Sequence, residues 1–99
     1  MEEKMNQLAA IIAESERMRG AYFWTPPQSA SMRRTYERKH THPRICWEEN
    51  GHKWTAEYTV QCSCRNIYAK GIYTKDGAQT TLTAIRNSLK RMESRTISA

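Results

Sequence analysis

The residue types that bind metals are concentrated in one stretch of this 99-residue chain. All three histidines and all three cysteines lie between residues 40 and 64, and imidazole and thiolate groups are ligands that zinc prefers. A structural zinc site usually takes its cysteines from a turn with two to four residues between them, whereas one residue separates Cys62 from Cys64. On a strand these two side chains would share an apolar face. We therefore expect buried structural thiols, and we predict neither a metal site nor a cofactor.

The carboxylates, glycines and nucleophiles form no arrangement typical of a catalytic site. Asp76 is the only aspartate, and Glu48 and Glu49 are adjacent, so on a strand they would face opposite ways. The four glycines form no phosphate-binding loop, and no serine or cysteine stands in a nucleophile motif. We therefore expect a binding protein and not an enzyme, with no catalytic residues.

The formal net charge is +6, and the basic side chains are unevenly distributed along the chain. Residues 1–20 carry three basic against four acidic side chains, whereas residues 21–99 carry thirteen against six. A basic body favours an anionic partner, most commonly DNA or RNA, and the alternative is that the charge only keeps a small protein soluble. The candidate nucleic-acid-binding residues are Arg33, Arg34, Arg38, Lys39, Arg44, Arg65, Lys70 and Lys75.

A short aromatic run offers a different kind of contact. Tyr22, Phe23 and Trp24 precede Pro26-Pro27, and exposed aromatic side chains anchor many protein interfaces. The alternative function is therefore a small inhibitor or adaptor that docks on a larger host protein, for example a nucleic-acid-processing enzyme. Burial of Trp24 in the domain's own core would remove the main support for this alternative. Short chains with an irregular arm are typical of phage and prophage accessory proteins, and we expect this chain to be one.

The N-terminal residues predict a helix over residues 2–19. Met1, Met5, Leu8 and Ile12 recur at spacings of four, three and four residues, which places them on one helical face. Gly20 is a natural stop for this helix. The apolar stripe either covers the sheet or pairs with a second copy, and the second case would give a homodimer.

Residues 21–43 have the composition of an irregular basic and aromatic arm. Pro26-Pro27 forbids a helix through that point, and Pro43 is expected to close the arm. Within it, residues 32–42 are compatible with either a short helix or an extended segment.

Residues 44–73 predict three antiparallel strands. Asn50-Gly51 is a signal for a tight hairpin, and a two-residue turn pairs Glu49 with His52, so that Trp47 falls opposite Trp54. The second strand, residues 53–64, alternates polar and apolar side chains, which predicts a core face. The members of that face are Trp54, Ala56, Tyr58, Val60, Cys62 and Cys64. Residues 66–73 form the third strand.

The C-terminal residues predict a helix from Thr74 to about Arg91. Thr74 is a suitable N-cap and Asp76 favours a helix start. One face of this helix carries Ala78, Leu82, Ile85, Leu89 and Met92. The expected fold is therefore a single α+β domain over residues 1–99. Its core over residues 44–92 is an antiparallel three-stranded sheet packed on the C-terminal helix, with an additional N-terminal helix.

The sequence also indicates where the protein acts. No apolar run approaches the roughly 20 residues that span a bilayer, and Glu2 and Glu3 stand where a signal peptide carries positive charge. We therefore expect a cytoplasmic protein without a membrane partner.

Two motifs and a helix between Lys53 and Leu89 carry a family resemblance. They are Lys53-Trp-Thr-Ala-Glu57, then Tyr68-Ala-Lys-Gly-Ile-Tyr-Thr74, then Ala78 and Ala84. This stretch resembles the Apetala-type DNA-binding domain and the arm-binding domain of tyrosine recombinases. The resemblance implies that the outer face of the sheet lies in the major groove, with Arg44 and Arg65 as the candidates for reading bases.

A second resemblance rests on Lys70-Gly71 and on Thr74-Lys75 before an alanine-containing helix. In these residues the chain resembles a double-stranded-RNA-binding domain, and the resemblance implies an RNA duplex as the ligand. Both resemblances lead to the same expectation, a small basic nucleic-acid-binding accessory protein.

Overall fold

The part of the chain that the structure describes contains three helices and a four-stranded antiparallel sheet. Its structure, a computed structural model, describes residues 2–18, 29–63 and 66–98, with side chains as far as residue 95. The elements are α1 (Glu2–Arg17), α2 (Ala30–His40), β1 (His42–Glu49), β2 (His52–Cys62), β3 (Ile67–Lys75), β4 (Ala78–Gln79) and α3 (Leu82–Ser98). The strand order is β1-β2-β3-β4. The predicted α+β class is confirmed, with four strands where the sequence indicated three.

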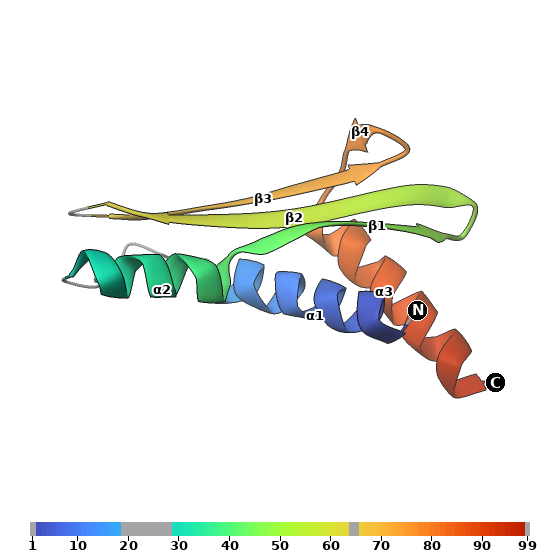
Figure 1. Ribbon diagram of the computed structural model, residues 1–99. Coiled ribbons are helices and arrows are strands. Elements are labelled where there is room, and N and C mark those ends of the chain that lie inside the picture. The colour runs from blue at the N-terminus through green and yellow to red at the C-terminus, as the bar shows by residue number, and fades with distance from the viewer. Residues whose placement is uncertain (1, 19–28, 64–65, 99) are drawn as a thin grey trace.

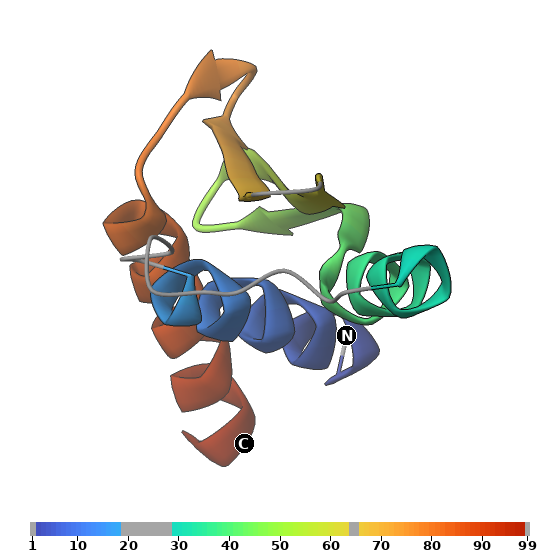
Figure 2. The same cartoon turned by 90° about the vertical axis from the view of Figure 1, so that its left-hand side faces the viewer.

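The helices lie on one face of the sheet and leave the other face open (Figure 1). After a quarter turn, α1 is seen between α2 and α3 beneath the sheet (Figure 2). Residues of α1, β1, β2 and α3 form a common buried core between these layers. None of the described helices covers the open face of the sheet, so its described side chains can contact solvent or a partner.

The β1–β2 hairpin supplies the centre of the core. Asn50 and Gly51 have φ angles of 55° and 77°, as a two-residue turn requires. Trp47 pairs with Trp54, as predicted, and their rings stack with centroids 6.2 Å apart. The predicted core face of β2 is confirmed from Trp54 to Val60, whose alternate side chains are buried.

The apolar stripe of α1 is buried in this core. Leu8, Ile11 and Ile12 are nearly inaccessible to solvent, because the helix packs on the sheet. The stripe is therefore occupied within the chain and is not a free surface for a second copy, so the structure lends no support to a dimer through this helix.

Of the two conformations left open for residues 32–42, a short helix or an extended segment, the structure has a helix. Residues 30–40 form α2, and Ser29 is its N-cap. The Ser29 Oγ accepts a hydrogen bond from the backbone N–H of Met32 at 3.1 Å. The expectation that Pro43 closes the segment is wrong, since β1 already begins at His42. Proline is tolerated there because β1 is an edge strand whose pairing with β2 is irregular between residues 42 and 45.

The start of the C-terminal helix is also different from the prediction. Thr74 is not an N-cap, because β3 continues to Lys75 and then turns back. Asp76 and Gly77 have φ angles of 52° and 83° and form a second tight turn, which leads into β4. The helix is instead capped by Thr81, whose Oγ1 accepts from the N–H of Ala84 at 3.2 Å.

The predicted apolar face of the C-terminal helix is partly confirmed. Ile85, Leu89 and Met92 are buried, whereas Ala78 lies exposed in β4.

No helix among the described residues is long and apolar enough to cross a membrane. Several predicted positions lie outside the described residues, namely Tyr22, Phe23, Trp24, Cys64 and Arg65.

Candidate nucleic-acid interface

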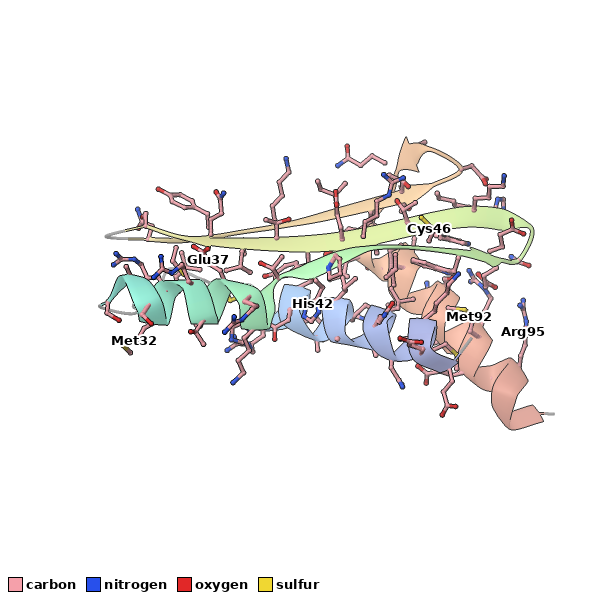
Figure 3. All side chains as sticks on the ribbon, viewed as in Figure 1. Met32, Glu37, His42, Cys46, Met92 and Arg95 are labelled. Atoms are coloured by element: carbon pink, nitrogen blue, oxygen red, sulfur yellow. The ribbon has the colours of Figure 1, made fainter. Side chains whose placement is uncertain are left out.

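The outer face of α2 carries a row of basic side chains. Arg34 and Arg38 are one helical turn apart, about 6 Å along the axis, and both are exposed, as is Lys39. Glu37, the only acidic residue of the helix, points the other way. Its Oε1 accepts a hydrogen bond from the backbone N–H of Cys62 at 2.7 Å, in the space between α2 and the sheet (Figure 3). The outward face of this helix is therefore cationic, with no negative charge of its own.

Several other cations of the described chain are neutralised by carboxylates. Arg86 pairs with Glu16, and Arg91 and Arg95 both contact Glu49. By contrast, Arg34, Arg38 and Lys39 form no ion pair with any residue that the structure describes. Their charges add to a positive potential on the surface of α2, which an anionic partner can neutralise.

The inner side of α2 is fixed by polar contacts to α1. His40 Nδ1 lies 2.9 Å from Glu14 Oε2, and an Arg17 guanidinium nitrogen lies 3.3 Å from Tyr36 Oη. The rings of Tyr36 and His40 are also in contact, with centroids 4.3 Å apart. These contacts attach the inner side of α2 to α1 and leave its basic row facing outward.

The first residue after α2 attaches the helix to the sheet. Thr41 Oγ1 accepts a hydrogen bond from Val60 N–H at 3.0 Å and lies 3.3 Å from the Val60 carbonyl oxygen, to which it donates. The threonine side chain therefore takes the place of a strand partner at that point of β2.

A shallow hollow lies beside the basic row. Ser31, Thr35 and Lys39 line it from α2, and Arg17 lines it from the end of α1. Met32 contributes an exposed apolar side chain, 57% accessible, which points away from the sheet (Figure 3). Hydroxyl, ammonium and guanidinium groups are the donors that proteins use toward phosphate and sugar oxygens. The hollow therefore extends the same kind of chemistry along the helix.

The open face of the sheet has mixed charge. Because side chains alternate along a strand, β1 and β2 place Arg44, Glu48 and Glu57 on this face, and β3 places Lys70 there. Tyr68 is 57% exposed on the same face. The two carboxylates would repel phosphates, so this face is a poorer candidate than α2 for binding a nucleic-acid backbone.

The predicted binding residues are therefore divided among several places. Arg33, half-buried, lies on α2 with the basic row, whereas Arg44 and Lys70 lie on the open face of the sheet. Lys75 lies on the opposite face of β3, with Nζ 5.3 Å from the centroid of a Trp54 ring, and forms a cation–π contact. The five-residue separation of Lys70 from Lys75 already indicated opposite faces, because the strand period is two.

A buried ion pair is the feature that the sequence did not reveal. The Glu49 side chain has no solvent exposure and accepts hydrogen bonds from Arg91. The hydrogen bond from Arg91 lowers the pKa of Glu49, against the opposing effect of burial. Nearby, Trp47 Nε1 donates to Ser88 Oγ at 3.0 Å. These contacts tie the end of β1 to α3 and belong to the fold, not to the interface.

The cysteines and histidines do not form a metal site in the described part of the chain. No group of three or more His, Cys, Asp and Glu side chains is close enough there to hold an ion. Cys46 and Cys62 are free thiols. Cys62 is half-buried, and burial raises its pKa, whereas Cys46 is exposed on the open face of the sheet (Figure 3). The expectation of buried thiols was based on Cys62, which is only half-buried, and on Cys64, which lies outside the described residues.

The chain matches no protein-family model, no curated protein and no solved structure. The resemblances to Apetala-type and double-stranded-RNA-binding domains stay predictions.

Proposed function

We propose that this chain is a small nucleic-acid-binding protein that holds the phosphate backbone through the outer face of α2. The observation that carries the proposal is the exposed row of Arg34, Arg38 and Lys39, which no carboxylate of the described chain neutralises. Glu37 supports the proposal as well. Its carboxylate, the one negative charge of α2, is directed inward to the Cys62 N–H and not toward the basic row.

The proposed contact is with the backbone and not with base edges. Arginine and lysine bind phosphates through charge and release condensed counterions. If Arg34, Arg38 and Lys39 each neutralise one phosphate of a duplex, the affinity should fall about 40-fold between 50 and 200 mM salt. Such binding carries little sequence information, so the protein would accept many sequences.

The proposed contact lies on a different surface from the one that the Apetala-type resemblance implies. That resemblance puts the open face of the sheet in the major groove, where Glu48 and Glu57 would approach phosphates. The surface of α2 lies on the opposite side of the sheet (Figure 1). We therefore assign the contact to the helix, with Arg44 and Lys70 outside it.

The test is a fluorescence-anisotropy titration of the full chain with duplex DNA, single-stranded DNA and duplex RNA, each at two salt concentrations. Tight binding to one form, weakening steeply with salt, supports the proposal and identifies the ligand. Absence of binding to every form at low salt contradicts it. In that case the positive charge serves solubility, and a pull-down from host lysate would test the alternative inhibitor or adaptor function.

A further inference from the structure

Among the described residues, the outer edge of β3 has a strand partner only at its C-terminal end. Within the described residues, β4 pairs only with Thr74 and Lys75. The N–H of Thr80 donates to the Tyr73 carbonyl at 2.9 Å, so the backbone of Tyr73 faces this outer edge. Because the direction of backbone groups alternates along an antiparallel strand, the N–H and C=O groups of Ile67, Ala69 and Gly71 face the same way. No strand within residues 2–18, 29–63 and 66–98 pairs with these groups, so a strand of another chain could.

The other edge of the sheet is protected against such pairing, and β3 is not. Strand β1 contains Pro43 and an irregularity between residues 42 and 45, and both features discourage the addition of a strand. The exposed part of β3 has neither a proline nor a break in its register with β2. Ala69 and Gly71 also keep its helix-side surface flat. An edge of this kind is a template for another strand.

We propose that two copies of this chain pair through β3, antiparallel, about a two-fold axis at Ala69. In this register Ala69 faces Ala69 of the second copy, and Ile67 faces Gly71 of the second copy. All of these residues direct their backbone groups outward, so the two strands would exchange up to about six hydrogen bonds. The two sheets would become one continuous sheet.

The side chains on the helix side of the strand fit this register. Gly71 has no side chain, and the Tyr73 ring lies where a Cβ at residue 71 would stand. Ile67 of the second copy would fall opposite Gly71 and beside that ring. Ile67 and Tyr73 are both only half-buried apolar residues of the core margin, so the pairing would complete their burial.

The side chains on the open face also fit. Tyr68 would lie opposite Lys70 of the second copy, and Lys70 opposite Tyr68. Both are exposed in the single chain, and an aromatic ring beside an ammonium group is a favourable cross-strand pair. No like charges face one another in this arrangement.

The shape of the chain leaves room for the second strand. The N–H of Ser63 donates to the Asn66 carbonyl at 2.8 Å, so the carbonyl of Asn66 faces the β2 side and not the outer edge. At the other end, β4 occupies the edge only beside Thr74 and Lys75. Residues 67–71 of the second copy therefore fit in the free length between them. The same faces of the two sheets would carry the helices, because odd-numbered β3 residues lie on the helix side in both copies.

The proposal is tested by charge reversal at the two-fold axis. Ala69 is exposed in the single chain, so Ala69→Glu and Ala69→Lys should both fold, which circular dichroism verifies. Sedimentation velocity over a concentration series should show a dimer for the wild type and monomers for each variant, because like charges directly opposite destabilise a strand pair. An equal mixture of the two variants should form the dimer again. Asn6→Glu, a charge added at an exposed position of α1 away from the β3 edge, should stay dimeric.

Three results would overturn the proposal. They are a wild type that stays monomeric at every concentration, an Ala69→Glu variant that stays dimeric, and a mixture of the two variants that fails to associate. Because the readout is mass and no nucleic acid is present, none of these results bears on the function proposed for α2.

Discussion

Arg91 holds the carboxylate of Glu49 with two nitrogen donors, Nε at 2.7 Å and Nη2 at 2.8 Å. The carboxylate is fully buried, whereas the Arg91 side chain is 40% exposed. Arg95 adds a third donor at 3.2 Å. The pair joins the last residue of β1 to the C-terminal helix. If one member is removed, water can solvate a remaining Arg91 but cannot reach a remaining Glu49.

That difference predicts an asymmetric cost of mutation. Arg91→Ala leaves a buried carboxylate with Arg95 as its remaining cation, and should lower the free energy of unfolding by about 3–5 kcal/mol. Glu49→Gln should cost less, about 1–3 kcal/mol, because the half-exposed Arg91 can turn to water. Urea unfolding measures both, and Lys90→Ala, at an exposed position of the same helix, should change stability by less than about 0.5 kcal/mol. A larger loss for Glu49→Gln than for Arg91→Ala would contradict the asymmetry.

The same pair predicts how stability depends on pH. The pKa of Glu49 is lowered in the folded chain, chiefly by its hydrogen bond from Arg91, whereas an unfolded glutamate titrates near ~4.3. The stabilisation is therefore complete above that value and is lost as the pH falls through the lower folded pKa. Unfolding curves collected through the acid range should show a smaller acid-dependent loss for Glu49→Gln than for the wild type. Equal losses would show that Glu49 is not the group responsible.

For the basic row of α2, we expect losses of nucleic-acid affinity that do not depend on sequence. Arg34→Ala and Arg38→Ala should each weaken binding and each reduce the slope of log K against log salt by about 0.9 for duplex DNA. Anisotropy titrations over a salt series give both quantities. Lys90→Ala removes the same charge from α3 and should leave the slope unchanged. An equal effect of all three variants would indicate a nonspecific response to net charge.

Gly71 and Tyr73 should be coupled energetically. A Cβ at residue 71 would overlap the end of the Tyr73 side chain, whose hydroxyl contacts Ser15 of α1. Gly71→Ala should therefore displace the ring and lower the free energy of unfolding by about 1–3 kcal/mol. In a Tyr73→Ala background the same substitution should cost little, and a double-mutant cycle measures the difference. An unchanged penalty in that background would mean that the strain lies elsewhere.

The second tight turn should tolerate only certain residues at Gly77. Its φ of 83° is unfavourable for a residue with a Cβ, so Gly77→Ala should cost about 1–2 kcal/mol. Gly77→Asn should cost less, since asparagine visits positive φ more readily. Thermal unfolding compares the two variants. Equal stability of both would indicate that the turn adopts another conformation when mutated.

The hairpin and the first helix were predictable because independent local signals agree there. Asn50-Gly51 fixes the turn, and the alternation along β2 assigns the same residues to the core that the turn register assigns. The helical spacing of Leu8 and Ile12 is likewise a local property. Where turn chemistry and periodicity point to one structure, the sequence is sufficient.

The helix α2 and the start of α3 were harder to predict, each for a physical reason. Within α2 no residue is fully buried, so the helix has little apolar periodicity and depends on contacts of Tyr36, Glu37 and His40 with distant residues. At residues 76–77 the Asp-Gly pair predicts a turn as strongly as Asn50-Gly51 does, but Asp76 also suits a helix start. The candidate binding residues were selected by their charge alone, and the charge of a lysine does not indicate on which face of a strand it lies.

The contact between the first and the last helix has a consequence for synthesis of the chain. Arg86 of α3 pairs with Glu16 of α1, and both helices contribute to one core. During synthesis α1 emerges from the ribosome before α3. The side chains of Leu8, Ile11 and Ile12 therefore lack part of their packing partners until α3 has emerged. Chaperones and proteases can reach this apolar surface during elongation, until α3 is available to pack on the core.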